Sequence, residues 1–390
     1  MKFILMNKNT PIALIEYDTN YNEIKNIYEI YNIDYAPLSI INANKDNLEN
    51  LVHIMNNWFK RRGIPLWRKD IENLLEKLNV TAPEELLNKA YALSLSDQYW
   101  IKEEKSSIKW SDINFFENDF NYKGYLEASL STESSEKAEL HSPNNTTDGM
   151  LQKGWIIENG KRVLVKGIYQ PSKEEPINEW LASNICKRLN FKYCNYSIDI
   201  VNNKIVSKCD NFITSDEEII SAYDVLNSKQ KSNNINDFEH YIQILEEHKI
   251  PNARKNVEDM FIIDFLMMNF DRHLKNFGII RNVNTLECVR TTPIFDTGES
   301  MQCDKLTGEI NFSNGTGKFF TNTNKNFSEM LSNIKDISRI DISALDGLVD
   351  EYNSILLKYQ PYTDSSLDRI DKLCNGLQIR IDKLKEFMKY

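Results

Sequence analysis

Two short segments of the sequence contain three side chains whose oxygen atoms could bind a metal ion or accept a proton. In "NFDRHLKNFG", Asp271 comes just after an apolar run that predicts a helix ending at Asn269, and Asn276 follows five residues later. A loop carboxylate can accept the proton of a substrate hydroxyl, and an amide oxygen is a hard ligand suited to Mg²⁺. The segment "FGIIRNVNTLECV" predicts a hairpin, which would bring Asp296 of "PIFDTGES" back beside Asn276. We therefore expect Asn276 and Asp296 to bind a metal next to Asp271.

Arg272 and His273 lie between the loop carboxylate and the amide. They could be a phosphate clamp and a general base. A lone Arg-His pair beside a loop carboxylate more often holds the loop through hydrogen bonds, so we expect supporting roles for both.

The parts needed to bind a triphosphate are available earlier in the chain. In "TTDGMLQKGW", Gly149 would let the backbone approach phosphate oxygens and Lys153 would add charge, although such a glycine is more commonly a turn glycine. In "VLVKG", Lys166 ends an apolar strand and could neutralise phosphates if Glu179 orients it. The alternatives are a solvent-facing strand lysine and an acid favoured at a helix start. Together these residues match what phosphoryl transfer from ATP requires.

The elements that must position these residues change along the chain. Residues 1–125 read as α-rich after a short initial strand, with no catalytic grouping and an unknown role. Residues 126–148 are rich in Ser, Thr, Asn and Glu, which predicts a mobile loop. Residues 149–215 predict a small β-rich part with one helix, and residues 216–390 a larger helical part. We expect an α+β fold whose two unequal lobes enclose a cleft.

Composition excludes several other classes of protein. The chain has 390 residues, 41% of them hydrophobic, and a formal charge of −10, which opposes direct nucleic-acid binding as the main activity. Its longest apolar stretch is too short for a membrane span, and the apolar start gives way at once to polar residues, unlike a secretory signal. The six cysteines show neither a CxxC pair nor a zinc-ligand spacing, which is typical of reduced thiols in a cytoplasmic protein.

"NFDRHLKNFG" followed by "IFDTGES" resembles the catalytic and metal-binding motifs of the HipA-like Ser/Thr protein kinases, D-R-H-x-x-N and a later Asp. Phosphatidylinositol 3/4-kinases carry a similar D-R-H-x-x-N. The resemblance implies a bilobal protein kinase-like fold, with ATP and Mg²⁺ as cofactors. It makes Asp271 the catalytic base and Asn276 and Asp296 the Mg²⁺ ligands. Lys166 and Glu179 would be the phosphate-binding lysine and its partner.

The same resemblance implies further sites. The segment "SKCDNFI" would be the hinge that contacts adenine, with Cys209 and Asp210 at its centre. Autophosphorylation of the phosphate loop would fall on Thr146 or Thr147, because no clear Ser occupies that place. Toxin members of the family meet a DNA-binding antitoxin through a small β-rich N-terminal domain. The sequence of residues 1–125 does not indicate one, so it gives no support for an antitoxin partner.

Three readings remain open from the sequence. The first is a Ser/Thr protein kinase, and the protein that it would modify is unknown. The second is a kinase-shaped module that binds nucleotide without transfer, since a fold alone does not imply an activity. The third is a kinase of phosphatidylinositol or another small molecule. Its lipid version expects a basic, apolar-tipped membrane loop that this acidic chain does not show, so no membrane partner is expected.

Overall fold

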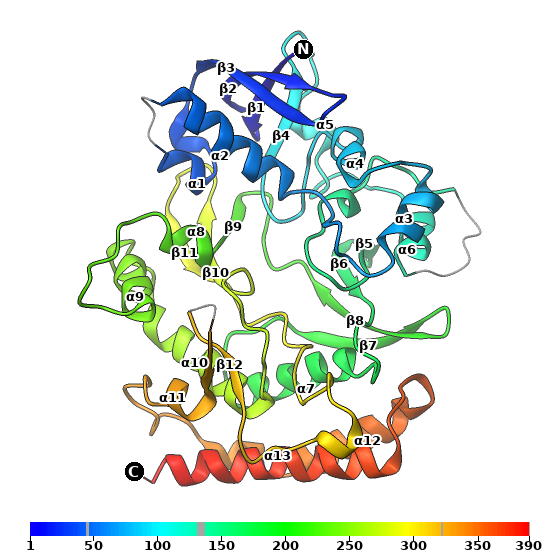
Figure 1. The fold of residues 1–390 in the computed structure, drawn as a ribbon, viewed down its shortest axis with the longest axis vertical. Coiled ribbons are helices and arrows are strands. Elements are labelled where there is room, and N and C mark those ends of the chain that lie inside the picture. The colour runs from blue at the N-terminus through cyan, green and yellow to red at the C-terminus, as the bar shows by residue number, and fades with distance from the viewer. Residues whose placement is uncertain (44–46, 131–136, 321–322, 390) are drawn as a thin grey trace.

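The computed structural model describes residues 1–43, 47–130, 137–320 and 323–389, which adopt a mixed α/β structure. Figure 1 shows an N-terminal sheet at one end of the long axis and the C-terminal helices at the other, with the remaining sheets between them.

The N-terminal end is an antiparallel four-stranded sheet of order β3-β2-β1-β4. Its strands are β1 (Lys2–Asn7), β2 (Thr10–Asp18), β3 (Glu23–Ile30) and β4 (Tyr99–Glu103). Helix α2 (Leu48–Lys60) buries Leu51, Met55 and Phe59 in one apolar core with the sheet. The other helices of this region are α1 (Leu38–Ile41), α3 (Ile71–Leu78), α4 (Pro83–Lys89), α5 (Trp110–Ile113) and α6 (Lys123–Ser129).

The expectation of an α-rich region with one short strand is wrong about the strands. Residues 2–30 form three strands joined by tight turns, in which Lys8 and Asn22 have positive φ angles of 48° and 49°. Asparagine tolerates this conformation, and the sheet is closed by β4 from seventy residues further along the chain. Apolar spacing in "NLENLVHIMNNWF", "DIENLLEKL" and "PEELLNKAYALSL" predicts helices, and the structure has α2, α3 and α4 within these segments or overlapping them.

The middle sheet, of order β5-β6-β8-β7, is antiparallel and carries a helix packed on its strands β7 and β8. Its elements are β5 (Lys153–Glu158), β6 (Lys161–Lys166), α7 (Glu175–Arg188), β7 (Tyr196–Val201) and β8 (Lys204–Asp210). The pairs Asn159-Gly160 and Asn202-Asn203 each predict a hairpin turn from the sequence. Both hairpins are present, with positive φ at all four residues. Helix α7 buries Ile177, Leu181 and Ile185 in the largest apolar core.

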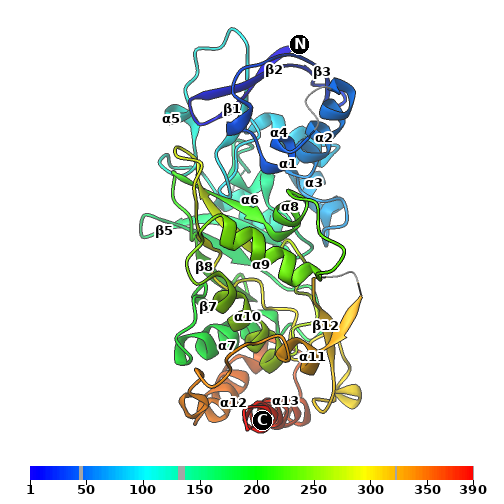
Figure 2. The same ribbon diagram turned by 90° about the vertical axis from the view of Figure 1, so that its left-hand side faces the viewer.

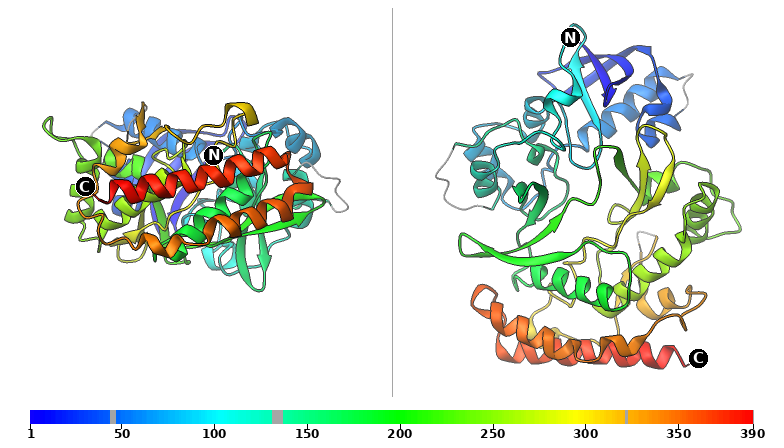
Figure 3. Two further views of the ribbon diagram at one scale, coloured as in Figure 1. Left: turned by 90° about the horizontal axis from the view of Figure 1, so that it is seen from below. Right: turned by 180° about the vertical axis from the view of Figure 1, so that it is seen from behind.

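The rest of the chain is mostly helical and shares that core. Its helices are α8 (Ala222–Leu226), α9 (Asp237–Glu247), α10 (Ala253–Met267), α11 (Phe327–Leu331), α12 (Leu348–Tyr359) and α13 (Leu367–Phe387). Its strands are β9 (Glu217–Ser221), β10 (Gly278–Asn282), β11 (Cys288–Thr291), β12 (Thr316–Lys318) and β13 (Asn324–Asn326). Figure 2 shows α9, α10 and α13 following one another away from the N-terminal sheet, and Figure 3 shows α12 and α13 side by side.

The predicted mobile loop, residues 126–148, is only partly a loop. It begins inside α6, and a 3-10 turn follows at Pro143–Thr146. Ser142, Asn144 and Asn145 are fully buried, which is the opposite of what their polar composition suggests. Residues 131–136 lie outside the described part of the chain. Among the helices described, none has both the length and the apolar content needed to cross a membrane.

Candidate active site

A cavity of about 940 Å³ lies where the middle sheet meets the loop after α10. It is lined by nearly all the residues that the sequence singles out: Thr146, Thr147, Gly149, Lys153, Lys166, Cys209, Asp210, Asp271, His273, Asn276 and Asp296. The other two, Glu179 and Arg272, are buried and bond to residues of this set. The structure therefore gathers segments that are up to 150 residues apart in the chain.

Lys166 lies at the end of β6 and is 3% exposed. Its ammonium group donates to Glu179 of α7 and, at 2.5 Å, to Oδ1 of Asp296. Glu179 also accepts from the hydroxyl of Ser207 on the neighbouring strand. Burial by itself would lower the pKa of Lys166, but the two carboxylates outweigh it and raise the pKa above its ordinary value. Lys166 is thus a fixed positive charge at the cavity wall.

Asp296 follows β11 in a left-handed backbone conformation, with φ of 55°. This conformation is uncommon for a residue other than glycine and is typical of functional positions, where the surroundings hold it. Here the backbone N–H of Asp296 donates to the Tyr196 hydroxyl at 3.3 Å. Burial would raise the pKa of Asp296, but Lys166 and Lys153 together lower it, so the carboxylate is charged. Its side chain is 30% exposed and accessible from the cavity.

The loop that follows α10 is held by a buried ion pair. Helix α10 ends at Met267, and Met268 takes a left-handed conformation that turns the chain. Asp264, one turn back in the helix, accepts from Nε and Nη2 of Arg272 at 3.0 to 3.2 Å and from the amide of Asn269 at 2.8 Å. Asn269 in turn accepts from the backbone N–H of Asp271 at 3.0 Å. These bonds fix the position of Asp271.

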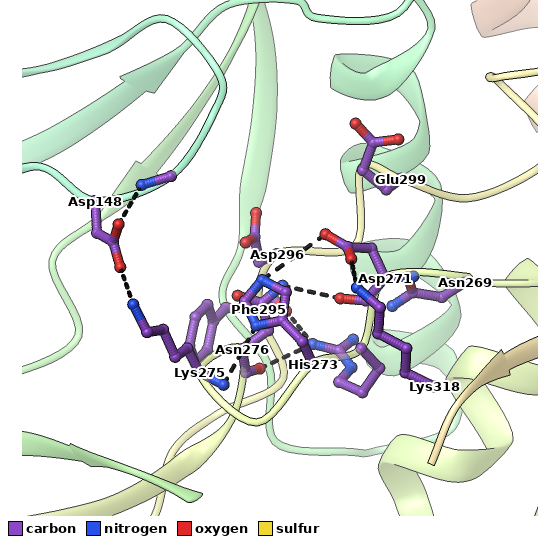
Figure 4. Close-up of polar contacts among 12 residues, drawn as sticks. Asp148, Asn269, Asp271, His273, Lys275, Asn276, Phe295, Asp296, Glu299 and Lys318 are labelled. Carbon is purple, nitrogen blue, oxygen red and sulfur yellow. Dashed lines mark hydrogen bonds and ion pairs between the residues drawn. The ribbon is translucent and has the colours of Figure 1, made fainter. Parts of the chain in front are cut away.

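Arg272 also joins the two predicted metal-binding segments. Its Nη1 donates to the backbone carbonyl of Asn276 at 2.9 Å and to that of Phe295 at 2.6 Å, which places Asn276 next to Asp296. The predicted hairpin is present as β10 and β11 in antiparallel register. The side-chain amide of Asn276 donates to the carbonyl of Asp271 at 3.1 Å, so its own carbonyl oxygen points away from that group. Figure 4 shows Asp271, Asn276 and Asp296 facing one region of the cavity.

His273 lies beside the loop carboxylate, with its Nε2 3.8 Å from Oδ2 of Asp271. Its Nδ1 accepts from the backbone N–H of Lys275 at 3.3 Å, so in the neutral ring the hydrogen is on Nε2. Burial lowers the pKa of His273, and the neutral ring is therefore the main form at pH 7. A neutral imidazole in this place can donate a hydrogen bond toward Asp271.

The phosphate-loop segment contributes a glycine and a buried lysine. Gly149 has a φ of 97°, a left-handed backbone conformation that favours glycine, and a Cβ built there would lie 2.8 Å from Nζ of Lys153. Burial lowers the pKa of Lys153 to about 8. Asp148 accepts from Nζ of Lys275 at 3.1 Å across the cavity, a contact drawn in Figure 4. The loop is thus tied to the segment that carries Asp271.

The loop is also anchored to the N-terminal region by Arg68, which is 4% exposed. Its guanidinium donates to the Thr147 hydroxyl at 2.9 Å, to the Thr147 carbonyl and to the Gly149 carbonyl at 3.1 Å. All these acceptors are neutral, and burial lowers the pKa of Arg68 to about 10. Lys69 adds a backbone bond to Met150 at 3.1 Å. Because none of these acceptors is a carboxylate, they do not neutralise the charge of Arg68, which adds positive potential beside the cavity.

The predicted hinge and the predicted phosphorylation sites are placed as follows. Cys209 is buried and Asp210 is exposed, pairing with Lys161 at 2.5 Å. The rings of Phe212 and Phe295 lie 5.5 Å apart and line the same end of the cavity, an apolar surface for a flat ring. Thr146 and Thr147 donate their hydroxyls to backbone carbonyls at 3.0 to 3.1 Å. Either hydroxyl would have to leave these partners to be phosphorylated.

Sequence reasoning missed three cavity-side residues. Arg68 belongs to the basic segment "KRRGIPLWRK", residues 60–69, whose composition is typical of a solvated helix end. Nothing in this segment indicates the contact of Arg68 with the phosphate-loop segment. Glu299 is three residues after Asp296, a spacing that could have drawn attention. Burial raises its pKa to about 7, and it accepts from Gln170 at 2.9 Å. Lys318 forms an ion pair with Asp271. It lies in strand β12, whose sequence contains no motif that would have indicated this contact.

The donor set fits a magnesium-bound triphosphate. In the described part of the chain, no cluster of three or more His, Cys, Asp or Glu side chains is arranged for a metal ion. Mg²⁺ does not need one, because it is commonly bound by one or two protein oxygens together with substrate phosphates. The charged Asp296 and the amide oxygen of Asn276 would supply those oxygens, and Lys166 and Lys153 would supply charge for the phosphates.

Comparison with known proteins finds one family model that matches more than half of the chain. The family model described as HipA-like C-terminal domain matches residues 135–345. The serine/threonine-protein kinase CtkA of Helicobacter pylori strain J99 is 27% identical over 259 residues, which cover 60% of this chain and 75% of CtkA. The crystal structure of H. pylori CtkA, titled a proinflammatory kinase, covers 60% of this chain and 94% of its own at 22% identity, with a TM-score of 0.46.

A second solved structure covers the whole chain. It is that of the Shewanella oneidensis MR-1 toxin-antitoxin system HipA, HipB and its operator DNA, and it is similar over 100% of this chain and 99% of its own. The TM-score is 0.54 and the identity 13%, so the likeness is one of fold. It extends over the N-terminal sheet as well as the residues around the cavity.

Proposed function

The chain belongs to the HipA-like C-terminal domain family, and from this membership we propose that it is an ATP- and Mg²⁺-dependent kinase of serine or threonine hydroxyls in a protein. In this proposal the cavity separates two lobes, residues 149–215 and residues 216–390. The observation that carries it is one cavity that is lined by Lys166, Asp271, Asn276 and Asp296. Lys166 is held there by its bonds to Asp296 and to the buried Glu179.

Each residue has a role that its position supports. Lys166 and Lys153 would neutralise the phosphates, and Asn276 and Asp296 would hold Mg²⁺, which when bound supplies further positive charge to the transferred group. Asp271 would accept the proton of the target hydroxyl as its oxygen bonds to the γ-phosphorus and the bond to ADP breaks. Catalysis would rest on positioning and charge neutralisation.

Transfer of labelled phosphate from ATP, to the protein itself and to proteins of a lysate, tests the proposal. Asp271→Asn and Asp296→Ala should each lower incorporation at least about a hundredfold. Asp199→Asn is the matched control, because Asp199 is an exposed partner of Lys208 outside the cavity lining. Undiminished transfer in both site variants would refute the assignment. Stabilisation of the wild type by nucleotide without any incorporation would favour the binding module instead.

An antitoxin-like partner stays a proposal. The sequence-based argument against it was the lack of N-terminal strands, and the structure shows a four-stranded sheet there. HipA of S. oneidensis, whose fold covers the full chain, is titled as a complex with HipB and operator DNA. Copurification of this chain with the product of a neighbouring gene would support such a partner, and a monomer with no associated protein would oppose it.

A further inference from the structure

A basic residue from outside the two motifs contacts the loop carboxylate. Lys318 ends the short strand β12, and its ammonium group donates to Oδ1 of Asp271, as Figure 4 shows. We propose that Lys318 is a positioning residue for transfer, which orients Asp271 and also binds the terminal phosphate of the nucleotide. The inference rests on the proposed function.

The strand that carries Lys318 is packed directly on the loop of Asp271. A Cβ at the preceding residue, Gly317, would lie 2.7 Å from the carbonyl oxygen of Asn269 and 2.8 Å from Cε1 of Phe327. Only glycine permits this approach without displacing the backbone. Asn269 is the same residue that fixes the backbone of Asp271, so the position of Lys318 is set by the loop it serves.

The contacts of Asp271 distinguish Lys318 from the other lysines that line the cavity. Oδ1 of Asp271 accepts from Lys318, while Oδ2 lies 3.8 Å from Nε2 of His273. Three other lysines line the cavity. Lys166 pairs with Glu179 and Asp296, and Lys275 pairs with Asp148. Lys153 lies beside Gly149 of the phosphate-loop segment. Lys318 is thus the lysine that contacts Asp271 among the ion pairs of the described residues.

Charge explains why such a cation would help. A carboxylate base and a triphosphate repel each other, and the repulsion is strongest when a hydroxyl must fit between them. Lys318 lines the cavity and its side chain is 36% exposed, so it can contact a ligand while bonded to Asp271. A cation shared by the base and the terminal phosphate lowers this repulsion and fixes their separation.

Nucleotide binding provides a readout that does not depend on turnover. Affinities for ADP and for a non-hydrolysable ATP analogue, both with Mg²⁺, are measured by calorimetry on the wild type and on Lys318→Met. The variant should bind the ATP analogue about tenfold more weakly and ADP equally well, because only the analogue has the terminal phosphate. Lys325→Met is the control, since Lys325 is an exposed lysine of the paired strand β13 (Asn324–Asn326).

Kinetics give the second readout. Lys318→Met should lower kcat about a hundredfold with a small change in KM for the acceptor, and Lys318→Arg should restore part of the rate. An unchanged ratio of ADP to analogue affinity, or a variant as active as the wild type or more so, would overturn the inference. The latter result would mean that Lys318 blocks Asp271. A wild type that binds nucleotide but transfers no phosphate would refute the proposed function, while the binding ratio would still test Lys318.

Discussion

Replacing Lys153 by methionine should stabilise the free protein and remove its response to nucleotide. Burial lowers the pKa of this lysine from 10.5 to about 8. At about 1.4 kcal/mol for each pH unit, holding the charged amine in the fold costs about 3 kcal/mol at pH 7. Methionine has a similar length and no charge, so the free energy of unfolding should rise by up to about 3 kcal/mol.

The pH dependence has a definite sign. Between pH 8 and 10.5 the unfolded chain binds more protons than the folded one, so the stability of the wild type should rise with pH in this window. Phosphates favour the charged amine, so nucleotide binding takes up a proton and weakens above pH 8. For a folded pKa of about 8, affinity should fall about tenfold between pH 7 and pH 9.

Urea unfolding at pH 7 and calorimetry with Mg²⁺ and a non-hydrolysable ATP analogue at pH 7, 8 and 9 measure both effects. Lys161→Met is the control, because Lys161 is at the exposed end of the adjacent strand and is 66% exposed. A Lys153→Met protein that is less stable than the wild type would refute the reasoning. So would an affinity of the wild type that does not change across this pH range.

Three further substitutions test other parts of the site. Glu179→Gln should destabilise the fold by about 3 kcal/mol in urea unfolding, because it breaks the buried pair with Lys166. Arg68→Met should weaken binding of the ATP analogue about tenfold in calorimetry, because it frees Thr147 and the loop around it. Gly317→Ala should lower phosphate transfer as Lys318→Met does, because the added Cβ displaces β12.

Each of these has a matched control with little expected effect. Glu158→Gln changes an exposed glutamate that pairs with Lys208. Lys60→Met changes an exposed lysine near Arg68 in the chain that lies outside the cavity lining, and Gly308→Ala adds a Cβ that meets nothing within 4 Å. A control variant could change the measured stability, affinity or phosphate transfer as much as the site variant it is matched to. In that case the effect is a general one on folding, and the role assigned to the site residue is wrong.

The local elements around the site could be predicted because their signals are local. Asn159-Gly160 and Asn202-Asn203 mark hairpins through their backbone preferences, and the apolar run before Asn269 marks α10. The same reasoning could have found β1 to β3, whose turn at Asn22 uses an asparagine in the same way. The pairing of β1 with β4 could not be predicted, because it joins residues almost a hundred positions apart.

The residues of the site also fall into those that local sequence signals predict and those that depend on contacts between distant segments. Asp271, Asn276 and Asp296 lie in two segments joined by one hairpin, so sequence spacing was enough to expect them together. Arg68 contacts the phosphate-loop segment and Lys318 contacts Asp271. Neither residue lies in a motif, and their contacts depend on tertiary packing. Burial of Ser142, Asn144 and Asn145 is also tertiary, because polar composition alone indicates an exposed loop.

The bonds from Arg68 to Thr147 and Gly149 limit how this protein can be divided or recombined. A fragment that begins at residue 126 would leave those loop groups without the guanidinium that holds them. A chimaera that takes its first 125 residues from a relative would need an equivalent arginine at the same point in space. The first 125 residues and the rest of the chain should therefore be inherited together. Recombination that replaces one of these regions with that of a relative should be rare in evolution.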